Sequence, residues 1–107
     1  MASNESQVQN AICEYLERRN HCFFRLNNIP AFNRGAGGGV TMRRLPKYTP
    51  KGLPDIVVIR FGKFIALEVK DKGKQSKDQK IFQEWCESAG ARYHIVRSID
   101  DCQELGL

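Results

Sequence analysis

Residues 52–70 read GLPDIVVIRFGKFIALEVK, and this stretch decides which fold the rest of the chain must complete. Two apolar runs flank a Gly-Lys pair, which is typical of two β-strands joined by a two-residue turn with glycine first. With Gly62-Lys63 as that turn, the strands pair so that Asp55 lies directly opposite Lys70. Residues two apart along a strand share a face, so Asp55, Glu68 and Lys70 are predicted to project from one side of the hairpin.

Two carboxylates and an ammonium at the end of an apolar hairpin are costly to bury unless they bind a metal ion or a phosphate. The pattern therefore indicates metal-dependent chemistry on phosphodiester bonds. A cross-strand ion pair between Asp55 and Lys70 is the simpler explanation, but it leaves Glu68 without a partner. The interpretation also depends on the register, because a three-residue turn at 61–63 would place Asp55 on the face opposite Glu68.

Length, charge and cysteine content limit the class of protein. A chain of 107 residues is expected to form one domain, residues 1–107. Its formal net charge of +5 fits a polyanionic partner such as nucleic acid, although many ordinary proteins are as basic. The four cysteines have no CxxC spacing, so we expect reduced, mostly buried thiols and a cytoplasmic protein that is not secreted. No stretch reaches membrane-spanning length, so we expect no membrane partner.

The periodicity of the apolar residues predicts the other elements. Helical spacing indicates helices over residues 5–19 and 77–89. Short strands are predicted at 21–26 and 93–96, and Ser98 caps a short last helix. The hairpin strands are apolar on both faces, which places them in the middle of a sheet covered by helices. Because strand–helix–strand connections are right-handed, the last strand should run parallel to the strand before the helix. The result is an α/β fold with a four-stranded mixed central sheet flanked by helices.

The two longer helices each carry a polar residue with two interpretations. Glu5 shares a face with Ile12 and Leu16, so it either complements the helix dipole or points toward the predicted site. Gln79 follows Ser76 by three residues, as in a capping box, yet it also borders the apolar stripe that faces the sheet. That stripe is expected to be buried, with Trp85 in the core, and it comprises Ile81, Phe82, Trp85, Cys86 and Ala89.

Residues 27–51 are the least regular part of the chain and are predicted to form a long, flexible, basic loop. Its glycine-rich run lacks the Lys-Ser/Thr of a phosphate-binding P-loop, so no small-molecule cofactor is expected. Its charge fits either a solvated loop or a mobile arm that contacts a nucleic-acid backbone, and lysines near the second helix fit phosphate contacts in the same way. The candidate contacts are Arg34, Arg43, Arg44, Lys47, Lys51, Lys72, Lys74 and Lys77.

These motifs resemble a known family of nucleases. Gly52-Leu53-Pro54-Asp55, thirteen residues before Glu68-Val69-Lys70, is similar to the signature of the PD-(D/E)XK nucleases. Glu5 with Gln7 and Gln9, and Ser76-Lys77-Asp78-Gln79 after the lysine, narrow the resemblance to the virus-type replication-repair nuclease domain, VRR-NUC, in its short single-domain form. The resemblance extends from Glu5 to Arg97 and implies a restriction-endonuclease-like αβββαβ core.

The resemblance also implies a mechanism. Mg²⁺ or Mn²⁺ would be bound by Asp55, Glu68 and the backbone carbonyl of Val69, with Glu5 as a further ligand, direct or through water. Lys70 would orient the attacking water or help to deprotonate it. Gln79 would belong to the active site and form a hydrogen bond to the lysine, a water or DNA.

The function that follows is metal-dependent endonucleolytic cleavage of branched DNA, most of all four-way Holliday-type junctions, by a symmetric homodimer. The short form of the family suggests a phage or mobile-element origin and a role in DNA repair. Two alternatives remain open: a flap or restriction-type endonuclease, or a module that binds nucleic acid without catalysis and uses the same face to grip phosphate.

Overall fold

The predicted hairpin lies at the centre of the fold. The computed structural model describes residues 4–26, 32–34, 40–42 and 47–107, and of residues 32–34 and 40–42 it describes the backbone alone. β4 (Ile56–Arg60) and β5 (Lys63–Val69) are antiparallel and form the middle of a four-stranded sheet.

The edge strands are β1 (Cys22–Arg25) and β6 (Arg92–Val96), in the order β1-β4-β5-β6. β1 pairs antiparallel with β4, and β6 pairs parallel with β5. The expected four-stranded mixed sheet is therefore confirmed, including the parallel last strand.

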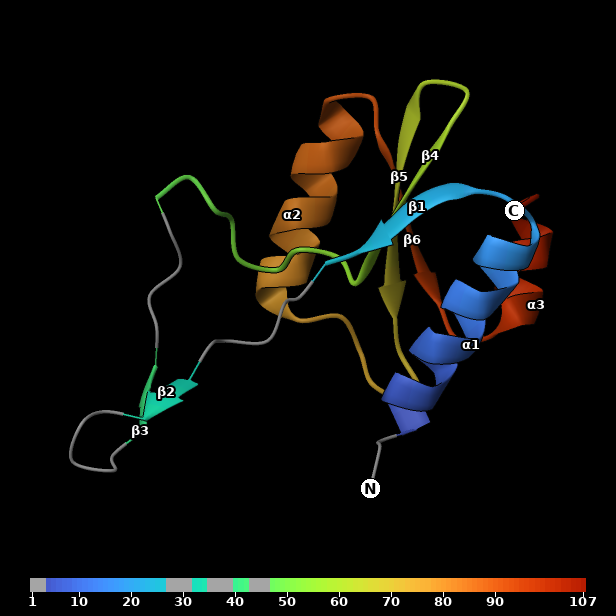
Figure 1. Ribbon diagram of the computed structural model, residues 1–107. Coiled ribbons are helices and arrows are strands. Elements are labelled where there is room, and N and C mark those ends of the chain that lie inside the picture. Colours follow the sequence, from blue (N-terminus) through green and yellow to red (C-terminus); the bar gives the residue numbers. More distant parts are fainter. Residues whose placement is uncertain (1–3, 27–31, 35–39, 43–46) are drawn as a thin grey trace.

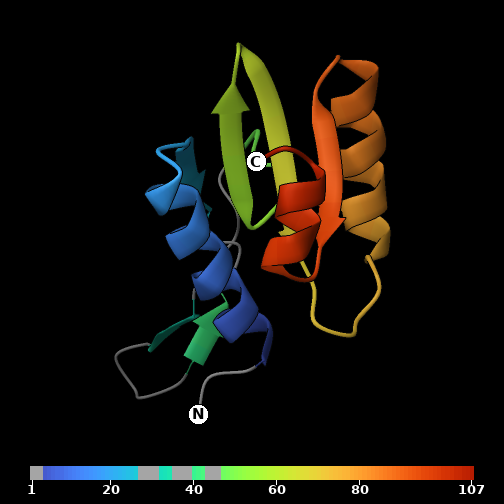
Figure 2. The ribbon, with the colours of Figure 1, turned by 90° about the vertical axis from the view of Figure 1, so that its right-hand side faces the viewer.

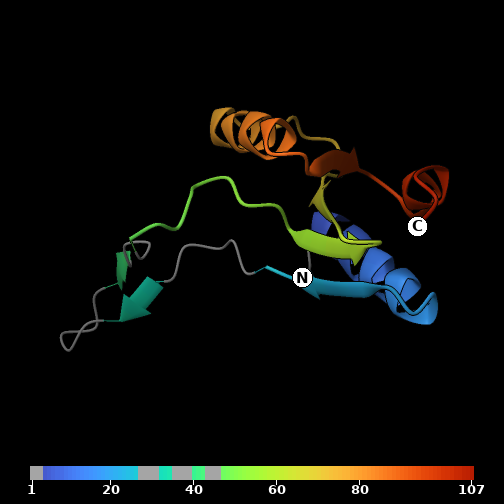
Figure 3. The same ribbon diagram turned by 90° about the horizontal axis from the view of Figure 1, so that it is seen from above.

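Helices cover the sheet on both faces. α1 (Asn4–Arg18) and α3 (Ile99–Glu104) lie side by side on one face, and α2 (Lys77–Ser88) lies on the other (Figures 1 and 2). Figure 3, which looks along the layers from above, shows the sheet between them. None of the described helices is both long and apolar enough to span a membrane.

The main core lies between the sheet and the layer of α1 and α3. Ile12 and Leu16 are fully buried one helical turn apart on α1, as their spacing predicts. They pack with alternate residues of the two central strands, among them Val58 and Leu67. The Tyr15 hydroxyl donates a hydrogen bond of 2.6 Å to the carbonyl oxygen of Leu107, which is itself buried. The last residue of the sequence is thus part of this core.

The turn of the hairpin differs from the prediction. Arg60 pairs with Lys63, so Phe61 and Gly62 form the two-residue turn instead of Gly62 and Lys63. Both turn residues have positive φ, 50° and 76°, which is the backbone of a type I′ turn and matches the twist of the strands. The predicted register was therefore wrong by two residues, although a shift of two leaves every side chain on its predicted face.

Two further predictions are corrected. Residues 27–51 are not a loop throughout, because β2 (Phe32–Arg34) and β3 (Val40–Met42) pair antiparallel in a separate two-stranded sheet. The four cysteines are free, but they are not mostly buried: Cys102 is buried, two are partly exposed, and Cys22 is exposed.

The apolar stripe of α2 is less buried than predicted. Phe82 is buried, whereas Ile81 is 56% exposed and Trp85 is 61% exposed. The physical reason is that α2 packs over β6, at one edge of the sheet, and does not extend over β1 and β4. On the same face, large apolar residues of the other strands are left partly exposed; these are Phe24, Ile59 and Phe64.

The corrected turn gives a stability prediction. Phe61 is 92% exposed and adopts a left-handed backbone, which costs an ordinary residue roughly 1–2 kcal/mol but suits asparagine. Phe61→Asn should therefore raise the free energy of unfolding by about 1 kcal/mol, even though it removes the contact between the Arg60 guanidinium and the Phe61 ring. Urea unfolding measures the change.

Phe61→Ala is the matched control, because alanine also removes the ring but keeps the unfavourable backbone. If the asparagine and alanine variants were equally stable, a type I′ turn at Phe61-Gly62 would be contradicted.

Candidate active site

The predicted acidic residues meet at one end of the two central strands. Ile56 pairs with Leu67, so the next step of the register places Asp55 level with Glu68. The prediction that Asp55 lies directly opposite Lys70 was therefore wrong, since Lys70 lies two residues further along. Asp55, Glu68 and Lys70 nonetheless stay on the same face of the sheet, because the shift is an even number of residues.

Hydrogen bonds to both neighbouring strands fix Asp55. Its side-chain Oδ2 accepts a hydrogen bond of 2.8 Å from the backbone N–H of Val69 on β5. Its backbone carbonyl accepts another of 2.8 Å from the N–H of Leu26, at the end of β1. The preceding residue, Pro54, is buried. The carboxylate is thus held at the junction of three strands.

Glu68 is the one charged side chain in the core of the described residues, with 2% of its surface exposed. Its Oε1 accepts a hydrogen bond of 2.7 Å from Gln79 Nε2 and lies 3.8 Å from Lys70 Nζ. Its Oε2 is buried and has no hydrogen-bond partner among the described residues. The ion pair of Lys70 is thus with Glu68, and not with Asp55 as the simpler explanation of the sequence required.

Electrostatics favour a proton or a cation at Glu68. Burial, followed by the nearby Asp55 carboxyl group, raises the pKa of Glu68 from 4.5 to about 8, and Lys70 opposes the rise. An acid with this pKa is mostly protonated at neutral pH when no cation is bound. A divalent cation would stabilise the ionised form instead, because it offsets both carboxylates at once.

Gln79 forms the predicted capping box and also contacts Glu68, rather than the lysine, water or DNA that the resemblance implied. Its Oε1 accepts from the backbone N–H of Ser76 at 2.8 Å, and its own N–H donates to Ser76 Oγ at 3.2 Å, which completes a capping box. The other end of the same amide, Nε2, donates to Glu68. One side chain therefore caps α2 and holds the buried carboxylate.

Glu5 lies in the first turn of α1 and is exposed. Its charge adds to the rise in the pKa of Glu68, less than Asp55 does. Among the described residues, however, no three histidine, cysteine, aspartate or glutamate side chains stand together as a metal-binding group. The structure brings Asp55 and Glu68 together and leaves Glu5 outside that pair.

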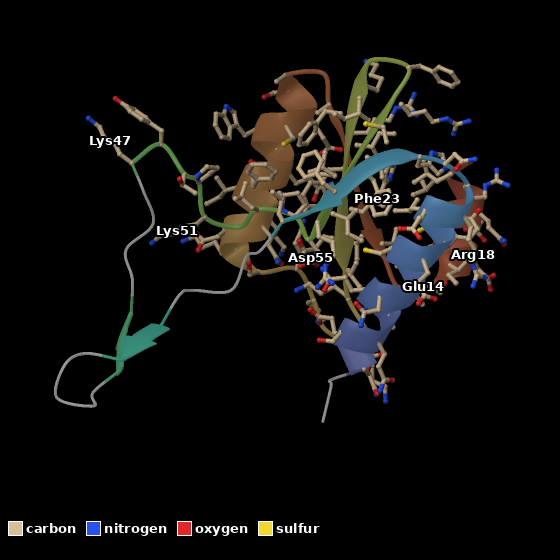
Figure 4. All side chains as sticks on the ribbon, viewed as in Figure 1. Glu14, Arg18, Phe23, Lys47, Lys51 and Asp55 are labelled. Carbon is tan, nitrogen blue, oxygen red and sulfur yellow. The ribbon has the colours of Figure 1, made fainter. Side chains whose placement is uncertain are left out.

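The candidate DNA-contacting lysines are exposed where the structure describes them; these are Lys47, Lys51, Lys72, Lys74 and Lys77. Lys47 and Lys51 lie along the segment that leads to Asp55 (Figure 4). Arg43 and Arg44 lie outside the described residues, and of Arg34 only the backbone in β2 is described.

Sequence reasoning missed Tyr93 as a neighbour of the site. Tyr93 lies on β6, pairs with Ala66 of β5 and is 3% exposed. Burial, and more weakly the charges of Glu68 and Asp55, raise its pKa to about 12. No sequence signal distinguishes it, because a tyrosine in a strand usually indicates packing alone.

Comparison with known proteins adds a structural match. One solved structure, described as a VRR_NUC domain, superposes with a TM-score of 0.66 and 24% identity over 97% of this chain and 95% of its own. The chain has the fold of a VRR-NUC domain. Comparison of the sequence with protein-family models and with curated proteins gives no match. The VRR-NUC fold confirms the expected restriction-endonuclease-like core with its mixed sheet and flanking helices.

The buried carboxyl group of Glu68 predicts a pH-dependent stability for the metal-free protein. The folded state holds this proton more tightly than the unfolded chain, so the stabilisation is fully present below pH 4.5 and is lost as the pH rises through about 8. Glu68→Gln should remove this dependence and make the protein more stable than wild type at the alkaline end. Urea unfolding with chelator across the range measures it.

Asp78→Asn, at an exposed acid in the first turn of α2, is the control and should keep the dependence of wild type. Equal pH profiles for wild type and Glu68→Gln would contradict a raised pKa at Glu68.

Proposed function

We propose that the protein is a metal-dependent endonuclease that hydrolyses phosphodiester bonds in branched DNA, with four-way junctions as its preferred substrate. The observation that carries the proposal is the pair of acids, Asp55 and buried Glu68, with Lys70 beside them at the end of β5 in a VRR-NUC fold. This combination of residues has little structural benefit, because a buried carboxylate weakens a core unless it is compensated.

The chemistry of the donors suits Mg²⁺ or Mn²⁺. Asp55 and Glu68 supply hard carboxylate oxygens, and Glu68 Oε2 is a buried oxygen without a partner among the described residues. The backbone carbonyl of Val69 would complete the set, with Glu5 as a further ligand through water, as its place outside the acidic pair favours. A bound ion supplies a polarised phosphoryl oxygen and a more acidic water.

The remaining residues position these groups. Gln79 donates to Glu68 and so fixes one carboxylate oxygen, which leaves the other free for a ligand. Lys70, 3.8 Å from the same carboxylate, orients the attacking water and offsets negative charge on the phosphate. The exposed lysines on the segment before Asp55 and on the turn before α2 contact backbone phosphates, which fixes the position of the DNA without reading its sequence.

Cleavage assays test the proposal directly. Purified protein with Mg²⁺ or Mn²⁺ is incubated with a four-way junction, a flap and a linear duplex of shared sequence. We expect the junction to be cut fastest, and cutting to stop with EDTA. Asp55→Asn and Glu68→Gln should abolish cleavage, and Lys70→Ala should slow it ~100-fold or more, as expected for a group that assists proton transfer.

Lys63→Ala is a matched control for Lys70→Ala, because Lys63 is an exposed lysine at the start of β5, whereas Lys70 directly follows the end of that strand. It should cut at the rate of wild type. Equal cutting of all three substrates would exclude junction selectivity, and preferential flap cutting would favour a flap nuclease. Junction binding without cleavage in either metal would favour a non-catalytic binding module.

We further propose that the protein acts as a homodimer, since a two-fold dimer would place two sites for paired cuts on opposing strands. The exposed apolar residues on the α2 face of the sheet favour this state, because contiguous apolar surface of this kind marks interaction sites. Ile59 and Phe64 are paired across the hairpin and are 42% and 38% exposed, and Phe24 lies on the next strand.

Phe64→Glu should therefore convert a dimer into a monomer, because it buries a charge in the apolar interface. Analytical ultracentrifugation measures the change, and circular dichroism checks that the variant is folded. Tyr48→Glu, at an aromatic residue that is 90% exposed outside the four-stranded sheet, should leave the dimer intact. A wild-type protein that sediments as a monomer at micromolar concentration would contradict the dimer.

A further inference from the structure

We infer that Gly52 is a positioning residue of the candidate active site. Without a side chain, it lets the first turn of α2 lie directly against the segment that carries Asp55, and so sets where Gln79 meets Glu68. The expected effect on cleavage rests on the proposed function, whereas the expected effect on the hydrogen bond between Gln79 and Glu68 does not.

The contact between Gly52 and α2 leaves no space for even one methyl group. A Cβ added at Gly52 would stand 2.5 Å from both the carbonyl carbon and the carbonyl oxygen of Asp78, and 2.7 Å from the backbone N of Gln79. All three are backbone atoms of a helix, so none of them can rotate out of the way. Since non-bonded heavy atoms prefer about 3.5 Å or more, one of the two segments would have to move by about 1 Å.

The segment before Asp55 cannot easily be the one that moves. Leu53 packs against the cluster of Ala66, Phe82 and Tyr93, and Pro54 is fully buried. Asp55 follows at once and is bonded to β1 and β5. The first turn of α2 is therefore the part that moves, because residues 76–78 are exposed.

A shift of α2 acts on Gln79 first. Its amide is held at both ends, by the Ser76 N–H at 2.8 Å and by Glu68 Oε1 at 2.7 Å. If α2 moves, the amide therefore cannot keep its hydrogen bond to Glu68 unless its hydrogen bond to the Ser76 N–H breaks. A displacement of about 1 Å lengthens the bond to Glu68 beyond hydrogen-bonding distance, and the buried carboxylate loses a donor.

The sequence offers two matched controls for the experiment. Gly62 and Gly90 also have positive φ, 76° and 91°, but a Cβ added at either would meet nothing within 4 Å. Alanine at all three positions brings a similar backbone penalty, and only at Gly52 does it also displace a neighbour. Comparison of the three variants therefore separates the effect of the steric contact with α2 from the effect of the positive φ.

The test measures three properties of Gly52→Ala, Gly62→Ala and Gly90→Ala: junction cleavage, thermal stability, and exchange of the Gln79 side-chain amide by NMR. We expect Gly52→Ala to lower kcat by ~100-fold, the loss that a 1 Å misplacement can cause. Its Gln79 amide should exchange as fast as that of Gln7, which is exposed. The two control variants should lose stability but keep kcat within about twofold of wild type and keep the protected amide.

A double variant shows whether Gly52 acts through Gln79. In a Gln79→Ala background, Gly52→Ala should lower kcat little further, because residues that share one interaction are not additive. Full additivity, or a Gly52→Ala variant with wild-type kcat and a protected Gln79 amide, would overturn the inference. If wild type cuts no substrate, the proposed function fails, and the amide exchange still decides the role of Gly52.

Discussion

Burying an ionised carboxylate costs several kcal/mol unless other groups replace the water that it loses. Glu68 meets this constraint at the end of a central strand with 2% of its surface exposed, and the groups that compensate it come from two elements. Lys70 directly follows β5, the strand of Glu68, and Gln79 comes from the first turn of α2. The helix must therefore begin where its cap can reach the strand, which explains why one amide serves both Ser76 and Glu68.

The compensation is incomplete, and this suits a ligand-binding site better than a structural ion pair. Glu68 keeps one buried oxygen without a partner among the described residues, and Asp55 raises its pKa further. Such a site binds a proton when empty and would bind a divalent cation by releasing that proton. Asp55 is held by a backbone N–H of β5 and by the N–H of Leu26, which directly follows β1. An acidic pair of this kind fits the metal-dependent hydrolysis of phosphodiester bonds proposed above.

The sequence predicted the four-stranded sheet and the face on which Asp55 and Glu68 both lie, but not the register of the β4–β5 hairpin. Alternation along a strand has a period of two, so a shift of two residues leaves Asp55 and Glu68 on the same face while it changes their partners. The turn depended on a positive φ at Phe61, a non-glycine residue for which the sequence gives no signal. The stripe of α2 was likewise recognised, but periodicity does not say that the helix packs toward the β6 edge of the sheet and leaves Trp85 exposed. The contact between Gly52 and the backbone of Asp78 exists only in three dimensions.

The central claim is that Asp55 and Glu68 form one cation site. A crystal structure of the protein with Mn²⁺, with data collected at the manganese absorption edge, tests this most directly. The account predicts one strong anomalous peak in contact with a carboxylate oxygen of each acid, with Gln79 still bonded to the other oxygen of Glu68. Manganese bound elsewhere, or bound by Asp55 alone without contact to Glu68, would contradict it.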